Sequence, residues 1–140
     1  MQDFGKLLLR LSVGGLMLFH GIHKVSDFEG TMKFMEGLLS AKGLPTVLAY
    51  GVWVGELVAP GLIIIGLFTR ISGLIVAGTM AMAVYLAHMD DLIPPGGGFP
   101  KLTGVGGFFL ELQALFFFGG LALACLGSGK IAIASGDSED

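Results

Sequence analysis

The chain has 140 residues, of which 54% are hydrophobic and 14% are charged, with a formal net charge of −3. Soluble globular domains carry roughly 25% charged residues, so this composition argues against a soluble domain. The small net charge, with no basic stripe, argues against nucleic acid as a partner. The single cysteine, Cys125, excludes an internal disulfide and any Cys-x-x-Cys redox pair.

Four long apolar runs fill most of the sequence, and a helix needs ~20 mostly apolar residues to span a bilayer. We therefore predict an all-α protein, an integral membrane four-helix bundle in one domain at residues 1–134. The helices are expected at about 4–23, 46–68, 71–88 and 105–127, with a polar tail at 135–140. Lys6 precedes the first run as in a signal peptide. No small-x-small cleavage site follows, so we expect this helix to be retained.

Two longer connections are expected at the end of the bundle opposite the termini, because successive helices alternate in direction. Residues 26–45 have helical spacing of their apolar positions and predict a short amphipathic helix. It lies either in the membrane interface or as a solvated helix packed on the bundle. Residues 89–104 include three prolines and a run of three glycines, which forbid regular helix. They form either a cap over the mouth of the bundle or a plain connector.

Glu56 is the most informative single residue, because it interrupts the second apolar run at a depth of ~15 Å. A carboxylate near the middle of a membrane must be neutral, paired or hydrated, so we expect it to face the bundle interior. Pro60 follows four residues later and removes the backbone hydrogen bond to the Glu56 carbonyl, which predicts a kink. Glu56 is either a working acid or the partner of a basic residue such as Arg10, His20 or Lys24.

The direction of each helix places most of the other polar side chains in the same half of the bundle. A catalytic role is predicted for Glu56, His20, His88 and Glu111, and a cofactor-binding role for Lys24, Gln113 and Arg10. The histidines suit metal ligation, proton relay or hydrogen bonding to a carbonyl. No tight ligand spacing such as His-x-x-x-His is present, so no metal site is predicted. Arg10 lies near the terminal side, where its guanidinium has the alternative of snorkelling to the interface.

Several short motifs occur in an order and spacing that resemble a known family. They are Leu9-Arg10, His20-Gly-x-x-Lys24, Glu56, Gly66-Leu-x-Thr-Arg70, His88, Glu111 and Gly127-Ser-Gly129. Over residues 4–133 the chain resembles the DoxX family of small four-helix bacterial membrane proteins. The resemblance implies a multi-pass protein of the cell (inner) membrane, with cytoplasmic termini and the polar half toward the outside. Relatives include the membrane subunit of a thiosulfate:quinone oxidoreductase.

Three functions are compatible with these residues, and they leave open whether the chain is an enzyme by itself. The first is a redox-associated, quinone-linked membrane subunit, in which His and Glu side chains exchange protons with a quinone and a partner protein supplies the electrons. Haem or a metal is a weaker cofactor hypothesis. The second is a non-enzymatic accessory or assembly subunit of a larger membrane complex. The third is a dimeric proton-coupled transporter of small molecules. The expected partners are membrane lipid, a protein of the same complex and a second copy of the chain.

Overall fold

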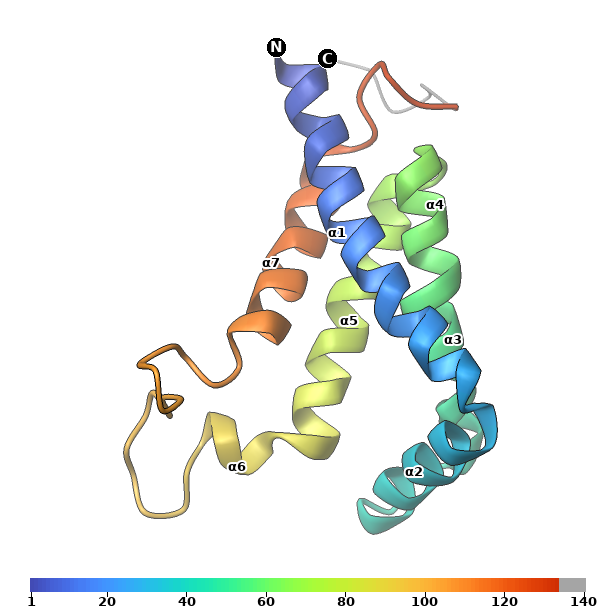
Figure 1. The fold of residues 1–140 in the computed structure, drawn as a ribbon. Helices are drawn as coiled ribbons and strands as arrows, with labels where there is room; N and C mark the ends of the chain where they lie inside the picture. The colour runs from blue at the N-terminus through green and yellow to red at the C-terminus, as the bar shows by residue number, and fades with distance from the viewer. Residues whose placement is uncertain (134–140) are drawn as a thin grey trace.

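The computed structural model describes residues 1–133, and within them all regular secondary structure is helical apart from one isolated bridge between Leu102 and Phe108. The predicted polar tail at 135–140 lies outside the described residues. The all-α class is thus confirmed. Figure 1 shows long helices running side by side, with shorter helices gathered at the end opposite the N-terminus. The elements are α1 (Gln2–Ser26), α2 (Phe28–Ala41), η1 (Thr46–Tyr50), α3 (Gly51–Trp53), η2 (Val54–Val58), α4 (Ala59–Ile65), α5 (Thr69–Ala87), α6 (Met89–Leu92) and α7 (Glu111–Leu126).

Three helical columns are long and apolar enough to cross a membrane. They are α1, the continuous column Thr46–Ile65 that runs from η1 to α4, and α5. The fourth apolar helix, α7, has 16 residues and is shorter than expected. Its predicted start near residue 105 is wrong, because Thr103 to Gly107 form a tight turn in which Gly106 has φ 84°. Only glycine adopts that backbone readily, so the helix cannot begin before the turn is complete.

Glycines set the distances between the helices. A Cβ atom on Gly73 of α5 would lie 2.5 Å from the carbonyl oxygen of Gly120 on α7, and a Cβ on Gly120 would lie 2.6 Å from that of Gly73. Larger side chains at either position would force α5 and α7 apart, as at small-residue interfaces in membrane bundles. The core between the columns is formed by Val13, Met17, Ala59, Ile63, Val76, Met80, Phe116 and Leu123.

Arg10 joins the helix ends near the N-terminus. Its side chain is 1% exposed, so the predicted snorkelling to the interface is wrong. Its guanidinium donates to the carbonyl oxygens of Ile63 and Ile64 at 2.8 and 2.7 Å, and to those of Ser128 and Ile131 at 3.0 and 2.5 Å. The last carbonyls of a helix lack intrahelical donors and carry partial negative charge, which an arginine there satisfies.

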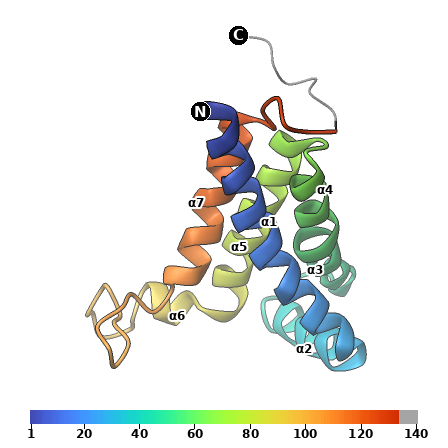
Figure 2. The same cartoon turned by 45° about the horizontal axis from the view of Figure 1, so that its top comes forward.

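The N-terminus and residues 127–133 lie at the same end of the molecule, as helix alternation predicts (Figures 1 and 2). The backbone N–H of Lys130 donates to Asp3 Oδ1 at 3.0 Å, and that of Ile133 donates to the Ile65 carbonyl at 3.1 Å. The amphipathic segment forms α2 at the opposite end, where Met32 and Leu39 pack with Ala49. The connection after α6 extends to the side of the molecule away from α2.

Candidate functional site

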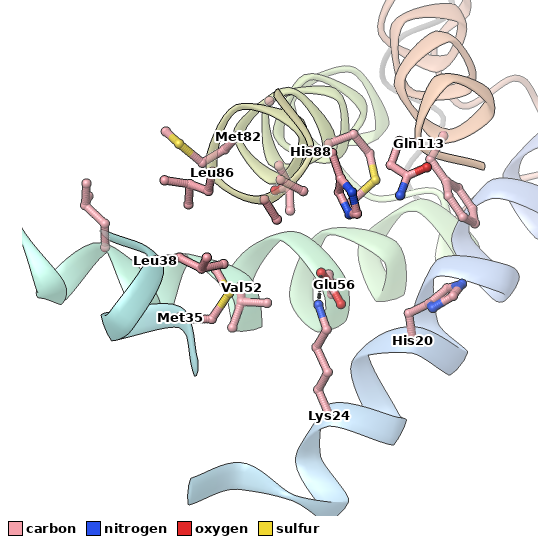
Figure 3. Close-up of a pocket in the computed structure, with 18 of the residues that line it drawn as sticks. His20, Lys24, Met35, Leu38, Val52, Glu56, Met82, Leu86, His88 and Gln113 are labelled. Atoms are coloured by element: carbon pink, nitrogen blue, oxygen red, sulfur yellow. Dashed lines mark hydrogen bonds and ion pairs between the residues drawn. The ribbon is translucent and has the colours of Figure 1, made fainter. Parts of the chain in front are cut away.

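A cavity of about 810 Å³ lies in the half of the molecule that carries α2 and α6. Its wall is built by α1, α2, the column from η1 to η2, α5 and the first turns of α7. Its polar lining includes five of the predicted site residues, as Figure 3 shows: His20, Lys24, Glu56, His88 and Gln113. The structure therefore brings together five of the seven side chains predicted for the site.

Glu56 is at the centre of the polar group and is 4% exposed. It lies in the middle of the π-helical segment η2, directly before the α4 turn that contains Pro60. Because Pro60 has no N–H, the regular ladder cannot continue there, and the predicted irregularity takes the form of this π segment. Single π turns within α-helices are common at functional sites.

Lys24 is the basic partner of Glu56. Its Nζ lies 2.5 Å from Glu56 Oε1, with 34% of the lysine side chain and 5% of the glutamate side chain exposed. The second carboxylate oxygen, Glu56 Oε2, is buried and has no hydrogen-bond partner among the described residues. The pairing predicted as one alternative is thus present, yet it satisfies only half of the carboxylate.

Two glycines allow the elements to approach closely enough for this pair to form. A Cβ atom on Gly21 of α1 would collide with the backbone carbonyl of Glu56, and one on Gly55 would collide with the Thr79 side chain of α5. Gly21 is therefore the contact point between α1 and η2. Lys24 lies almost one turn further along α1, which brings its ammonium group to the carboxylate (Figure 3).

Gln113 of α7 and His20, one turn before Lys24 on α1, lie on the same side of Glu56 (Figure 3). Gln113 Oε1 is buried and has no hydrogen-bond partner among the described residues. The His20 ring meets Phe116 edge to face, with centroids 5.8 Å apart. The cavity thus contains two buried acceptor oxygens, Glu56 Oε2 and Gln113 Oε1, that lack donors. Buried polar groups are nearly always hydrogen-bonded, so both require a donor that the described residues do not provide.

His88 directly follows α5 and is held by Asp91, a residue outside the predicted site. His88 Nδ1 lies 3.1 Å from Asp91 Oδ2, and Lys101 of the long connection binds the other carboxylate oxygen. Hydrogen bonds from Lys101 and His88 hold the pKa of Asp91 below its ordinary value. The i,i+3 spacing of His88 and Asp91 was the available signal. An ionised carboxylate accepts only, so Nδ1 carries the proton and a neutral His88 ring keeps Nε2 as an acceptor.

Two predicted site residues do not line the cavity. Glu111 is exposed at the start of α7, because that helix begins later than expected and its first residue stays at the edge of the bundle. Arg10 lies in the other half, where backbone carbonyls engage its guanidinium. Residues 89–110 do not line the cavity either, so the long connection is not a cap over it. Within residues 1–133 no three His, Cys, Asp or Glu side chains are grouped so that they could hold a metal ion.

The long apolar helices, with an ionisable group buried between them, define a multi-pass membrane protein. The chain belongs to the DoxX family, whose profile matches residues 5–89. That range contains His20, Lys24, Glu56 and His88, whereas Gln113 lies beyond it. A Bacillus subtilis (strain 168) protein named "Putative oxidoreductase CatD" is 37% identical over 82 residues, which are 59% of this chain and 58% of that protein. No solved structure matches the chain.

Proposed function

We propose that the chain is a redox-associated membrane subunit that binds a quinone and its reduced form, the quinol, in the cavity. The observation that carries this proposal is the pair of buried acceptors without donors, Glu56 Oε2 and Gln113 Oε1. Leaving a buried acceptor unsatisfied costs about 1–3 kcal/mol. A ligand with two O–H groups on an apolar ring removes this cost by donating a hydrogen bond to each of the two oxygens. A quinol is such a ligand. The relative named as an oxidoreductase supports a redox role.

Oxidation of a quinol breaks two O–H bonds and releases two protons and two electrons. The hydroxyl at Glu56 gives its proton to that carboxylate. The hydroxyl at Gln113, whose amide oxygen cannot keep a proton, passes its proton on to Nε2 of His88, which lines the same cavity and whose Nδ1–H is oriented by Asp91. The electrons pass to a flavin, haem or iron–sulfur centre of a partner protein, and quinone reduction follows the same path in reverse. Lys24 compensates the charge of Glu56 whenever the carboxylate is ionised.

The proposal includes the placement of the chain in the cell membrane. In it, α7 is the fourth span, and α2 lies in the interface. The 16 residues of α7 extend roughly 24 Å at 1.5 Å per residue, somewhat less than the ~30 Å hydrocarbon core. The apolar residues 108–110 before the helix make up part of the difference. The termini face the cytoplasm and the cavity lies toward the outer leaflet.

A second candidate is an accessory subunit without activity, in which the cavity is filled by lipid. The ion pair between Lys24 and Glu56 favours this second candidate, because an ion pair between two helical elements also suits a structural role. The two candidates differ in what the carboxylate does. A working acid is needed for ligand binding, whereas a structural pair is replaceable by neutral side chains of similar size.

The test uses the full chain purified in mild detergent. Trp53, the only tryptophan, follows the cavity residue Val52 directly, so quinone quenching of its fluorescence reports binding near the site. We expect wild type to bind a benzoquinone and its quinol, and Glu56→Gln to lose quinol affinity by about tenfold, the effect of one charge-assisted hydrogen bond. The double variant Lys24→Met with Glu56→Gln controls for an unpaired lysine. Wild-type quinol affinity in that double variant would favour the accessory candidate.

A further inference from the structure

We infer that the ligand of this cavity is an amphiphile with a long apolar tail, which enters from the lipid between α2 and α5 and leaves its tail along that opening. This inference rests on the proposed function and adds to it the part of the ligand that is not the reacting ring. Three observations support it: the size of the cavity, the separation of its polar and apolar ends, and the side chains at its rim.

The cavity is too large for a ring alone. An apolar cavity of roughly 150 Å³ holds one benzene molecule. The volume here is about 810 Å³, several times that of a single ring. A tail-free ring bound at Glu56 would leave most of the space unfilled, and an unfilled apolar space loses contacts with its lining. The volume therefore matches a ring that carries a chain of several methylene or isoprene units.

Most of the polar side chains gather toward one end of the cavity, and the end toward α2 is apolar. In Figure 3, His20 and Gln113 lie on one side of Glu56, and five apolar side chains lie on the other: Met35, Leu38, Val52, Met82 and Leu86. The apolar group comes from α2, α3 and α5. Its flexible methionines adapt to irregular chains. A ligand whose ring hydrogen-bonds at Glu56 thus has an apolar path in the direction of α2.

The rim at this apolar end faces outward. Phe34 of α2, Leu48 of η1 and Met82 of α5 line the cavity and are nevertheless 61%, 47% and 42% exposed. In a membrane protein, apolar side chains that are exposed within the hydrocarbon region contact acyl chains. The opening that they border is therefore a lateral entrance from the bilayer, and a lipid-soluble tail passes it without desolvation of polar groups.

Two glycines on the wall provide a direct test. Gly78 of α5 and Gly51 at the start of α3 both line the cavity, and a Cβ atom on either would have no heavy atom within 4 Å. A leucine at Gly78 therefore extends into open space without a backbone clash, and it favours helix more than glycine does. Gly15 of α1 is the matched control, because its Cβ also meets nothing within 4 Å and it does not line the cavity.

The experiment compares two quinols with the same ring, one without a tail and one with a decyl tail, on the full chain in one detergent. Wild type should bind the tailed quinol more tightly. Gly78→Leu should weaken the tailed ligand by about tenfold or more, because displacing even two buried methylene groups has that effect. The tail-free quinol should change less than about twofold, and Gly15→Leu should behave as wild type. Gly51→Leu repeats the test on a different element.

The outcomes separate this inference from the function on which it rests. Equal wild-type affinity for both quinols, once the micelle-bound fraction of each has been measured and subtracted, or equal loss of both in Gly78→Leu, would overturn the tail site while leaving a ring site at Glu56 intact. Absence of binding of either quinol to a folded wild-type chain would reject the proposed function, and the tail site with it. Partition of the decyl tail into micelles is the same for all variants and cancels in the ratio of their affinities.

Discussion

Lys24 Nζ and Glu56 Oε1 lie 2.5 Å apart, although 32 positions separate them in the sequence. The pair joins α1 to the π segment of the second column, and it is asymmetric in exposure. The lysine side chain is 34% exposed and the glutamate side chain 5%. Removal of the lysine and removal of the glutamate should therefore lower the stability of the fold by different amounts.

Lys24→Met should destabilise the protein more than Glu56→Gln does. The first variant leaves a buried carboxylate without a counter-charge, which costs about 3 kcal/mol when a buried pair is broken. The second variant leaves a lysine side chain that is one-third exposed and becomes hydrated, so its cost in stability is about 1 kcal/mol. Thermal unfolding in detergent, followed by circular dichroism, gives the order. Equal midpoints for the two variants would show that the pair is hydrated on both sides.

Arg10→Lys should destabilise the fold by about 3 kcal/mol without changing quinol affinity. Lysine keeps the charge but cannot direct donors to the carbonyls of both Ile63, at the end of α4, and Ser128, in the segment after α7. Unfolding measurements test the first part, and fluorescence titration of the folded variant tests the second. A loss of affinity in a fully folded Arg10→Lys protein would return Arg10 to the binding site, where the sequence analysis had placed it.

Gly21→Ala should weaken the Lys24–Glu56 contact without changing either of these two residues. The added methyl group collides with the Glu56 carbonyl, so α1 must move away from η2 and the Lys24–Glu56 contact lengthens. Overpacking of this kind costs about 1–3 kcal/mol. Gly15→Ala on the same helix meets nothing within 4 Å and should be neutral or stabilising by up to about 1 kcal/mol. Similar unfolding midpoints for the two alanine variants would contradict the close approach at Gly21.

Asp91 should tether the connection after α6 in a pH-dependent way. Its pKa is lowered, first by the hydrogen bond from Lys101 and then by that from His88. A carboxylate with a lowered folded-state pKa contributes its stabilisation above its ordinary value, 3.8, and loses it as the pH falls through the lower folded-state pKa. The tether therefore holds at neutral pH and still at pH 3.8, and it is released only as the pH falls further, through the lowered folded-state pKa of Asp91.

The rate of proteolysis reports how firmly Asp91 holds the connection after α6. At pH 7, trypsin should cut after Lys101 slowly in wild type and faster in Asp91→Asn, where the carboxylate that holds Lys101 is absent. Asp90→Asn is the control, because Asp90 is exposed and neighbours the same connection. As the pH falls through the lowered folded-state pKa of Asp91, the rates at which an acid protease cuts wild type and Asp91→Asn should converge. Identical cleavage of both at pH 7 would show that Asp91 does not hold the connection.

Much of this arrangement could be predicted from residue types and helix direction. Hydrocarbon solvates charge poorly, so Glu56 is predicted to face the interior. The alternating direction of the helices places His20, His88 and Gln113 in the same half of the bundle as Glu56. What failed depended on local backbone geometry. The turn that delays α7 needs Gly106 at positive φ, which apolar spacing does not reveal, and Glu111 was misplaced for that reason.

The other differences involve partners that no pattern in the sequence indicates. For Arg10 we predicted a cofactor-binding role, with snorkelling to the interface as the alternative. Instead, carbonyls from the end of α4 and from the segment after α7 converge on it, and such convergence exists only in the folded chain. Asp91 was passed over because its role depends on Lys101, ten residues away in a connection without regular structure. The tail end of the cavity depends on the position of α2, which the amphipathic pattern predicted as a helix without specifying what it packs against.

The most direct test of the central claim is an experimental structure of the full chain with a decyl-tailed quinol bound. We expect a ring hydroxyl within hydrogen-bond distance of Glu56 Oε2, a second ring hydroxyl near Gln113 Oε1, and the tail directed between α2 and α5. A cavity filled by a lipid acyl chain, with the quinol bound elsewhere and Glu56 bonded to Lys24 alone, would contradict it.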